Sequence, residues 1–372
     1  MRPGTPGLCV ESDRVAGCWV MSLTVDTRTF ANLVADPEAA ETLSAALGCP
    51  LVVVEVPDAA SARWLAGLRS GALPAVVVLV VPDPGCLTAS AALAGDIVLT
   101  EDASAPAPFV PARGGAMQVA NQIGAMLADH PVAGTALALL QRGAAGLPVS
   151  AAVVAESATY STLQAGAEFA AWRASRPARP HDPVDAASER VRTERTDLTM
   201  RIVLNRPARR NAVDYRMRDA LAAALAAAVA EPGLQVELRG SGPDFCAGGD
   251  LDEFGSRPDP AQAHLIRLTR SPALLLHRIA ERTTAFLHGS CLGAGIELPA
   301  FASRVIAAPD TRLGLPEIRL GLIPGAGGTA SLTRRIGRSR TTYLALTGET
   351  LEADVALQWG LVDAINPLAE PT

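Results

Sequence analysis

Two glutamates in glycine-rich surroundings are the residues of this sequence best suited to chemistry. Glu297 follows the small-residue run Gly293-Ala294-Gly295, and Glu317 comes twenty positions later, after Pro316. Glycines let the backbone approach a ligand closely, and carboxyl groups in apolar surroundings tend to have raised pKa values, which suits general acid–base catalysis. The plainer alternative is that Glu297 binds backbone N–H groups at a helix N-terminus while Glu317 lies in a surface turn.

Composition excludes several other kinds of chemistry. All 32 basic residues are arginine, which excludes Schiff-base lysine and P-loop sites. The six cysteines and five histidines show no metal-ligand spacing, so we expect no metal and interpret the cysteines as thiols in a reducing cytosol. A net charge of -6 argues against nucleic-acid binding. With no signal peptide and no apolar run near the ~20 residues that span a bilayer, we expect a cytoplasmic protein with no membrane partner.

Two series of strands and helices can position these glutamates. β-branched or apolar runs predict strands at 51–56, 74–81, 96–100, 198–204, 234–238, 284–287 and 304–308. Helical patterns lie at 30–47, 61–68, 90–94, 116–140, 215–229 and 261–279. An Arg- and Pro-rich segment between the two series predicts a linker at 181–196, or alternatively a surface loop within one domain. The sequence therefore predicts an α/β protein with domains at 1–180, including an extension at 1–22, and at 197–372.

The two halves also resemble each other. In the best register, Gly114-Gly115 matches Gly327-Gly328, while Glu297 falls on Ala89 and Glu317 on Phe109. The first half would then be a degenerate repeat that keeps the scaffold and lacks both acids. Coincidence between two α/β halves of similar composition is the alternative.

Seven short motifs follow one another in the second half. They are Leu204-Asn205-Arg206-Pro207 with Asn211-Ala212, Arg239 to Gly242, Asp244 to Leu251, Gly293 to Glu297, Leu315-Pro316-Glu317, Ile323-Pro324-Gly325 and Trp359 to Asp363. Together they resemble the crotonase (enoyl-CoA hydratase/isomerase) superfamily over residues 198–365, and only as the faded repeat over 50–165. The resemblance implies a crotonase-like ββα spiral fold, here as two tandem domains.

The resemblance also implies roles for five catalytic residues. The backbone N–H groups of Gly249 and Ala294 would form an oxyanion hole for a thioester carbonyl. Most family members have glycine where this chain has Ala294, but alanine can serve if its φ is negative. Glu297 would orient and deprotonate a water, Glu317 would exchange a proton at Cα, and Gly325 would lend a further N–H.

Coenzyme A binding is implied at six positions, which are Ala208, Arg210, Ala212, Ala247, Asp250 and Leu251. Arg206, Arg209 and Arg210 are candidates for the phosphates, or simply a solvated surface. Where the family often has a basic residue, this chain has Asp252-Glu253, a departure that puts the usual nucleotide contact in doubt. We interpret His288 as a hydrogen-bonded core histidine.

This chain ends nine residues after Asp363, whereas family members usually continue with about three helices that cover the acyl pocket. The sequence therefore predicts a catalytic domain without that lid. Either the first half supplies the missing surface or the pocket is open. We expect the halves to pack as a pseudo-dimer, and the chain to form a homo-oligomer, with a trimer favoured.

These motifs predict an enoyl-CoA hydratase or dehydratase, a hydro-lyase acting on an acyl-CoA or an acyl-carrier-protein thioester. No cofactor is expected beyond the coenzyme A of the substrate. Alternatives within the superfamily are double-bond isomerisation and thioester hydrolysis. A third possibility is a non-catalytic partner subunit, against which the retention of both glutamates and both oxyanion loops argues.

Overall fold

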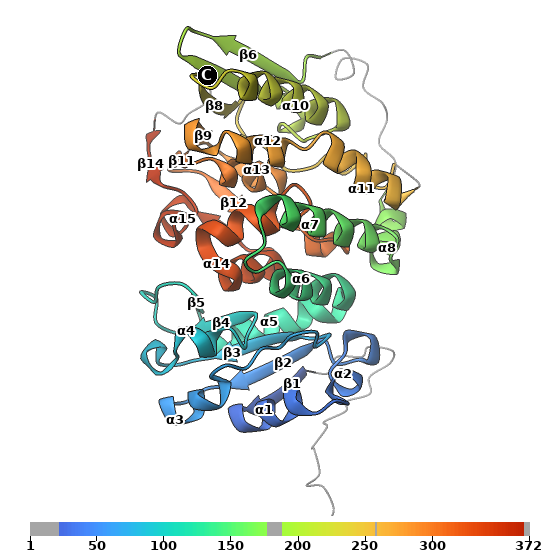
Figure 1. Cartoon of the computed structure of the whole chain (residues 1–372), viewed down its shortest axis with the longest axis vertical. Coiled ribbons are helices and arrows are strands. Elements are labelled where there is room, and N and C mark those ends of the chain that lie inside the picture. Colours follow the sequence, from blue (N-terminus) through green and yellow to red (C-terminus); the bar gives the residue numbers. More distant parts are fainter. Residues whose placement is uncertain (1–21, 177–187, 257–258, 368–372) are drawn as a thin grey trace, which may run out of the picture.

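The structure, a computed structural model, describes residues 22–176, 188–256 and 259–367. Nearly all of the predicted extension at 1–22 lies outside these ranges. The two halves of the chain stack along the long axis of the molecule (Figure 1). Between their sheets lie α5 (Ala116–Asp129), α6 (Pro131–Gly143), α7 (Val149–Gln164) and α14 (Gly328–Thr347).

Valine-rich strands form the sheet of the first half. Its five parallel strands follow chain order and are β1 (Ser22–Asp26), β2 (Leu51–Glu55), β3 (Val76–Val80), β4 (Ile97–Thr100) and β5 (Phe109–Pro111). Alternate side chains point to opposite faces, so Val53 and Val78 join the core with α5 and α6 while Val52 and Val77 pack on the outer face. The outer helices are α1 (Thr27–Ala35), α2 (Ala39–Thr42), α3 (Ala59–Ala62) and α4 (Ala89–Ala92).

The second half is built on a six-stranded sheet. Its order is β14 (Ala364–Ile365), β11 (Arg304–Ala307), β9 (Thr283–Leu287), β8 (Gln235–Gly240), β7 (Thr199–Leu204) and β6 (Val191–Arg195), parallel except for the β6–β7 pair. A smaller sheet joins β10 (Ser290–Leu292), β12 (Arg312–Gly314) and β13 (Thr350–Glu352). The remaining helices are α10 (Tyr215–Ala230), α11 (Pro260–Thr269), α12 (Pro272–Arg278), α13 (Ala294–Glu297) and α15 (Ala353–Trp359).

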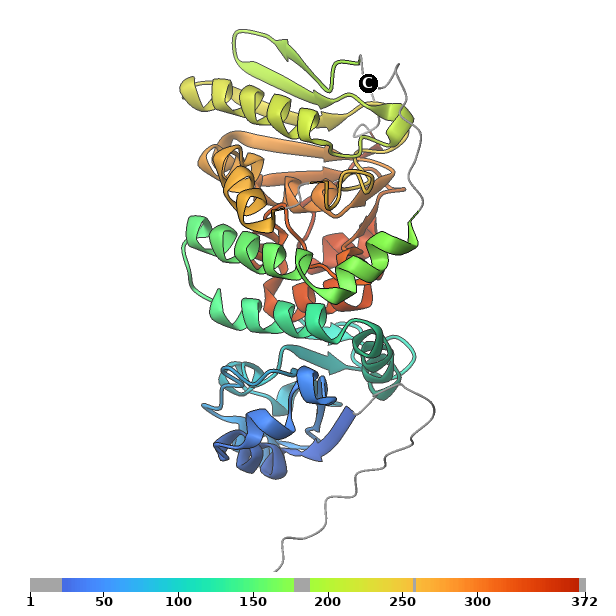
Figure 2. The same ribbon diagram turned by 90° about the vertical axis from the view of Figure 1, so that its right-hand side faces the viewer.

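Two helices at the end of the first half extend along the second half. α7 packs against α11, α12 and α14, and α8 (Ala167–Ser175) packs against the 3₁₀ turn Glu317–Leu320. Figure 2 shows both helices alongside the elements of the second half. A single hydrophobic core consequently runs from β2 and β3 through α5, α6 and α7 into the second sheet. The predicted packing of one half on the other is observed.

The α/β class is confirmed, and two local predictions are wrong. The predicted helix 261–279 is two helices, because the Ser271 side chain accepts the N–H of Leu274 and Pro272 begins α12. The predicted linker ends too late: 181–187 lies outside the described residues, but Val191–Arg195 is an edge strand whose residues beyond Val191 are exposed. Charged side chains are typical of such an edge. The sequence repeat remains a prediction.

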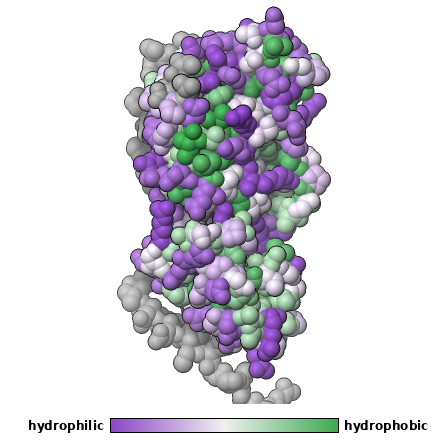
Figure 3. Space-filling model, turned by 90° about the vertical axis from the view of Figure 1, so that its left-hand side faces the viewer, coloured by the Kyte–Doolittle hydropathy of each residue, from purple (hydrophilic) through white to green (hydrophobic). Residues whose placement is uncertain are grey.

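On the face shown in Figure 3, hydrophobic residues gather in a patch over the second half. A small apolar cluster, separate from the main core, lies at the β9–β11–β14 end of that sheet and comprises Ile306, Ala308, Phe286 and Ala364.

Within the described ranges, no single helix is long and apolar enough to cross a membrane. The pair α5 and α6 meets the length and composition criteria only when taken together, with a bend of 114° between them. The predicted trimer remains a prediction.

Candidate active site

The structure brings the five predicted catalytic residues to one cavity. The cavity has a volume of about 570 Å³ and lies between α7, α11, α12 and the loops of the second half. Its lining includes Gly249, Ala294, Glu297, Glu317 and Gly325. Apolar side chains from several elements complete the wall, among them Val153, Phe254, Ile266 and Leu298. Polar groups at the end of an apolar cavity are typical of small-molecule sites.

Two loops present backbone N–H groups to this cavity. The N–H of Cys246 donates to Ser290 O (3.1 Å) and that of Leu292 to Cys246 O (3.0 Å), which holds the loops side by side. Neither Gly249 nor Ala294 donates its N–H to another described residue. Both N–H groups are therefore available to a ligand oxygen.

Alanine fits its position because Ala294 is the first residue of α13 and is not among the residues with positive φ. The left-handed position is taken instead by Gly293, with a φ of 50°. α13 is a single turn, so its helix dipole adds little positive potential at Ala294.

Glu297 is buried, with 2% of its surface exposed. Its Oε2 accepts the N–H groups of Ala326 (2.7 Å) and Gly328 (2.9 Å), so the glycine-rich turn before α14 holds the carboxyl group. A Cβ at Gly328 would lie 2.5 Å from Cγ of Glu297, and glycine is therefore required for this approach. Burial raises the pKa of Glu297 well above its ordinary value, and the nearby Glu317 and Glu156 raise it further.

Glu317 begins the 3₁₀ turn that follows β12, and it is also buried. A Cβ at Gly293 would lie 2.3 Å from Oε1 of Glu317, so this carboxyl group lies directly against the second oxyanion loop. Its Oε2 has no hydrogen-bond partner among the described residues. Burial and the charge of Glu156 raise the pKa of Glu317, which favours the protonated acid near neutral pH.

The first half supplies part of the cavity wall. Val153, Glu156, Ser157, Tyr160 and Gln164 of α7 line the cavity. Tyr160 packs so closely on the backbone that a Cβ at Gly325 would lie 2.5 Å from the tyrosine ring. Of the two alternatives, the structure favours the one in which the first half contributes surface to the site.

Glu156 is a third buried glutamate of the cavity, and the sequence did not predict its role. It is 1% exposed; its Oε1 accepts the Gly327 N–H (2.7 Å), and its Oε2 accepts the N–H (2.9 Å) and hydroxyl (2.6 Å) of Thr329. The available signal was a lone charged residue in the otherwise uncharged helix Val149–Gln164. Although three carboxyls meet, the described residues contain no cluster of His, Cys, Asp and Glu suited to a metal ion.

The six positions implied for coenzyme A lie on neighbouring loops. Ala247 donates its N–H to Arg210 O (2.9 Å), and Arg210 has a φ of 52°. Of these six residues, Asp250 alone lines the cavity, whereas Ala208, Ala212, Leu251, Ala247 and Arg210 lie outside its lining. The Arg210 guanidinium is half exposed and paired with Asp244 (2.8 Å).

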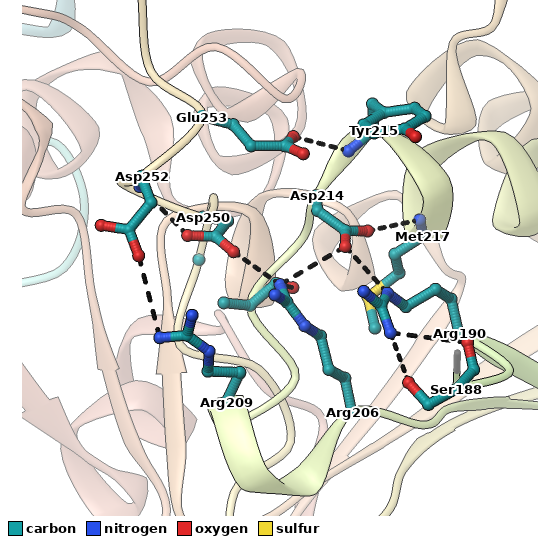
Figure 4. Close-up of polar contacts among 12 residues, drawn as sticks. Ser188, Arg190, Arg206, Arg209, Asp214, Tyr215, Met217, Asp250, Asp252 and Glu253 are labelled. Carbon is teal, nitrogen blue, oxygen red and sulfur yellow. Dashed lines mark hydrogen bonds and ion pairs between the residues drawn. The ribbon is translucent and has the colours of Figure 1, made fainter. Parts of the chain in front are cut away.

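A polar network beside the cavity ties these loops together (Figure 4). Arg206 is 5% exposed and donates to Asp250 (2.7 Å) and to the Ala212 carbonyl (3.0 Å). The suggestion that Arg206 binds the phosphates of coenzyme A is therefore wrong, because its guanidinium is buried and already bonded within this network. Asp252, which stands where the family often has a basic residue, pairs with Arg209 (3.7 Å) and Arg176 (3.3 Å). These ion pairs join the loop to the end of α8.

His288 is the core histidine that the sequence predicts. It is 3% exposed, and its Nε2 lies 2.9 Å from the Gly242 carbonyl. Burial lowers its pKa, and it is not among the residues that line the cavity.

Comparisons with known proteins match the second half of the chain. A family model described as enoyl-CoA hydratase/isomerase matches residues 194–371. The chain is 37% identical over 175 residues to the mevalonyl-coenzyme A hydratase of Beauveria bassiana, covering 45% of this chain and 62% of the relative. It is also 37% identical over 169 residues to the 2,3-dehydroadipyl-CoA hydratase of Escherichia coli, covering 45% of this chain and 65% of that protein. The chain thus spans slightly less than two thirds of these curated relatives.

Solved structures give a similar result. The enoyl-CoA hydratase from Thermoplasma volcanium is 35% identical, covers 48% of this chain and 73% of its own, and has a TM-score of 0.45. A putative enoyl-CoA hydratase from Thermobifida fusca, in complex with CoA, is 29% identical, with coverages of 51% and 77% and a TM-score of 0.44. The family model and the curated hydratases show that residues 194–371 belong to the enoyl-CoA hydratase/isomerase family, that is, the crotonase superfamily.

Proposed function

We propose that the protein is an enoyl-CoA hydratase or dehydratase, which adds water to, or removes it from, the 2,3 double bond of an acyl-CoA thioester. One observation carries the proposal. Gly249 and Ala294, whose N–H groups donate to no other described residue, line the same cavity as Glu297 and Glu317. An isomerase needs one acid–base group, whereas hydration uses two, and both are in the cavity.

The first step would be polarisation of the thioester. Its carbonyl oxygen would accept both N–H groups, and they would stabilise the enolate charge that develops as water attacks Cβ. A preorganised donor of this kind typically contributes about 3–4 kcal/mol to the transition state.

The two carboxyls would then divide the proton transfers. Burial raises the pKa of both carboxyls, but Glu297 accepts two N–H groups that favour its ionised form, and in that form it would take the proton of the attacking water. Glu317, whose Oε2 has no hydrogen-bond partner among the described residues, would hand its proton to Cα. In the dehydration direction the same groups exchange roles.

Crotonyl-CoA tests the proposal through loss of its conjugated-enoyl absorbance. We expect turnover by the wild type, loss of turnover in Glu297→Gln, and unchanged turnover in Glu168→Gln, a carboxylate outside the cavity lining. Retained double-bond isomerisation in Glu297→Gln would favour the isomerase alternative instead.

If the wild type does not turn over crotonyl-CoA, calorimetry with acetoacetyl-CoA separates the remaining alternatives. Tight binding would indicate that the same site acts on a different acyl group, or on an acyl-carrier-protein thioester. No binding would contradict the proposal and favour a non-catalytic partner subunit.

A further inference from the structure

The turn before α14 has an unusual pattern of hydrogen bonds. Four consecutive residues donate their backbone N–H groups alternately to two carboxylates. Glu297 accepts from Ala326 and Gly328, and Glu156 accepts from Gly327 and Thr329. The turn is therefore held from both sides, once by the second half of the chain and once by the first.

We propose that Glu156 is a positioning residue of the active site, supplied by the first half of the chain, which fixes the turn that holds Glu297 and places a third carboxyl group beside the two acid–base carboxyls. The proposal rests on the proposed function for its activity readouts. Its structural content stands on the hydrogen bonds and can be measured without turnover.

Geometry gives Glu156 control over the turn. Both of its oxygens are used, and the Thr329 hydroxyl adds a third donor to the same carboxylate. These donors lie at the start of α14, a helix that is kinked at Gly337, and a negative charge is stabilised at such an N-terminus. Gly327 has a φ of 100°, and a Cβ there would lie 2.6 Å from the Phe301 ring, so the turn has little room to adopt another path.

Charge gives Glu156 a second effect. The titratable and charged groups around it are Glu297 and Glu317 across the turn, Tyr160 on its own helix, and Arg267 on α11. His264, also on α11, contacts the neighbouring Ser157 (2.9 Å). Arg267 offsets part of the negative charge, but its guanidinium is engaged by Ser157, Ser161 and Gln164 rather than by the carboxyls.

Three buried carboxyls this close cannot all be ionised at little cost. Burial raises the pKa of Glu156 to about 7, but the three hydrogen bonds that it accepts favour its ionised form. Oε2 of Glu317 has no hydrogen-bond partner among the described residues, which favours the protonated form. An ionised Glu156 raises the pKa of both Glu297 and Glu317. By this account the first half of the chain keeps Glu317 protonated as the acid.

Glu156→Gln removes the charge and keeps the side-chain length. Carbon-13 NMR of glutamate carboxyls in the full-length protein, assigned with Glu297→Gln and Glu317→Gln, would follow the titrations. We expect both midpoints to fall by about one pH unit. If hydration is observed, the kcat–pH profile should move to lower pH, and kcat at its optimum should fall by about 10- to 100-fold with little change in KM.

Glu156→Asp separates charge from position, and it still tests the proposal if the glutamine variant does not fold. It keeps the charge and withdraws the carboxylate by one methylene, so the midpoints should stay near their wild-type values while kcat falls. Midpoints that drop as far as those expected for glutamine would contradict the assigned role.

Glu168→Gln is the matched control. Glu168 accepts the N–H groups of Val132 (2.7 Å) and Ala133 (3.1 Å) at the start of α6, and it is not among the residues that line the cavity. Its loss should lower stability without moving the titrations. If Glu156→Gln also lowers only the melting temperature, Glu156 is a helix cap and the inference is overturned. If the titrations move but the wild type neither hydrates crotonyl-CoA nor binds acetoacetyl-CoA, the inference stands and the proposed function fails.

Discussion

Two helices, α5 and α14, begin at a pair of glycines, but different groups surround the two pairs. In the first half, Gly114 and Gly115 have φ values of 88° and 115°, and Glu101 lies 3.4 Å from the N–H of Ala116. The cleft there, of about 400 Å³, contains neither Ala89 nor Phe109, the residues at the register positions of the two acids. At α14 two carboxylates share four N–H groups and a third carboxyl lies close by. The same kind of helix start lies beside a separate cleft in one half and beside the candidate active site in the other.

The comparison suggests how the first half of the chain can contribute to a site in the second half. The first half lacks both acids in the predicted register, but its last helices cover the second half and bring Glu156 to the cavity. Changes in the second-half turn should therefore alter catalysis, whereas changes at the first-half counterpart should alter stability alone.

The largest effect is expected from removing one oxyanion donor. Ala294→Pro deletes only the N–H of the first residue of α13, a position where proline is tolerated. We expect kcat for crotonyl-CoA to fall by about 100- to 1000-fold. The control Ala89→Pro makes the same change at the exposed first residue of α4 and should leave kcat unchanged. Similar losses of kcat in both variants would contradict the claim that only the second-half position acts in catalysis.

Glycine-to-alanine changes sharpen the contrast between the two turns. In Gly328→Ala the new Cβ would push on Glu297 at 2.5 Å, so kcat should fall at least tenfold. Gly115→Ala adds no close contact but forces alanine to a φ of 115°, which should lower stability by about 1–2 kcal/mol and spare kcat. Activity assays and denaturant titrations measure both. A Gly115→Ala variant with full stability and reduced kcat would contradict the assignment.

The raised pKa of Glu317 predicts a trade-off between stability and activity. Because its folded pKa is above the unfolded value of 4.5, burial of this carboxyl is tolerated at low pH and becomes destabilising as pH rises through the folded pKa. Glu317→Gln should therefore gain stability over the wild type at pH 9 and little at pH 5, while losing hydration activity. Thermal denaturation at the two pH values measures this, and an equal gain at both would refute the buried-acid assignment.

The smallest effect concerns a position with no role in the cavity. Gly143 ends α6, and a Cβ there would meet nothing within 4 Å. Gly143→Ala should raise the free energy of unfolding by about 0.5–1 kcal/mol and leave kcat and KM unchanged. A loss of activity would mean that a change at the end of α6 alters the geometry of the site, which its packing does not indicate.

The predictable features share a physical basis. Strands such as 51–56 and 74–81 were predictable because β-branched runs buried on both faces leave a continuous apolar signal. The acid pair and oxyanion loops were predictable because close backbone approaches require glycine at positions such as Gly248, where a Cβ would lie 3.0 Å from Leu292 O.

The missed features depend on tertiary contacts. α7 is composed of small, mostly uncharged residues, so its sequence shows neither a clear apolar face nor its partner in the other half. The role of Glu156 consequently appears only when residues 171 positions apart meet. The break at Ser271-Pro272 was a local signal that the helical periodicity on either side obscured.

The most direct test compares crotonyl-CoA hydration by the wild type, Glu297→Gln and Glu317→Gln at the same pH and protein concentration. We predict turnover by the wild type and a loss of about 100- to 10,000-fold in each variant, since each removes one proton-transfer group. Wild-type rates in either variant would contradict the assignment of that carboxyl. Absence of turnover in the wild type, together with no binding of acetoacetyl-CoA, would contradict the hydratase account as a whole.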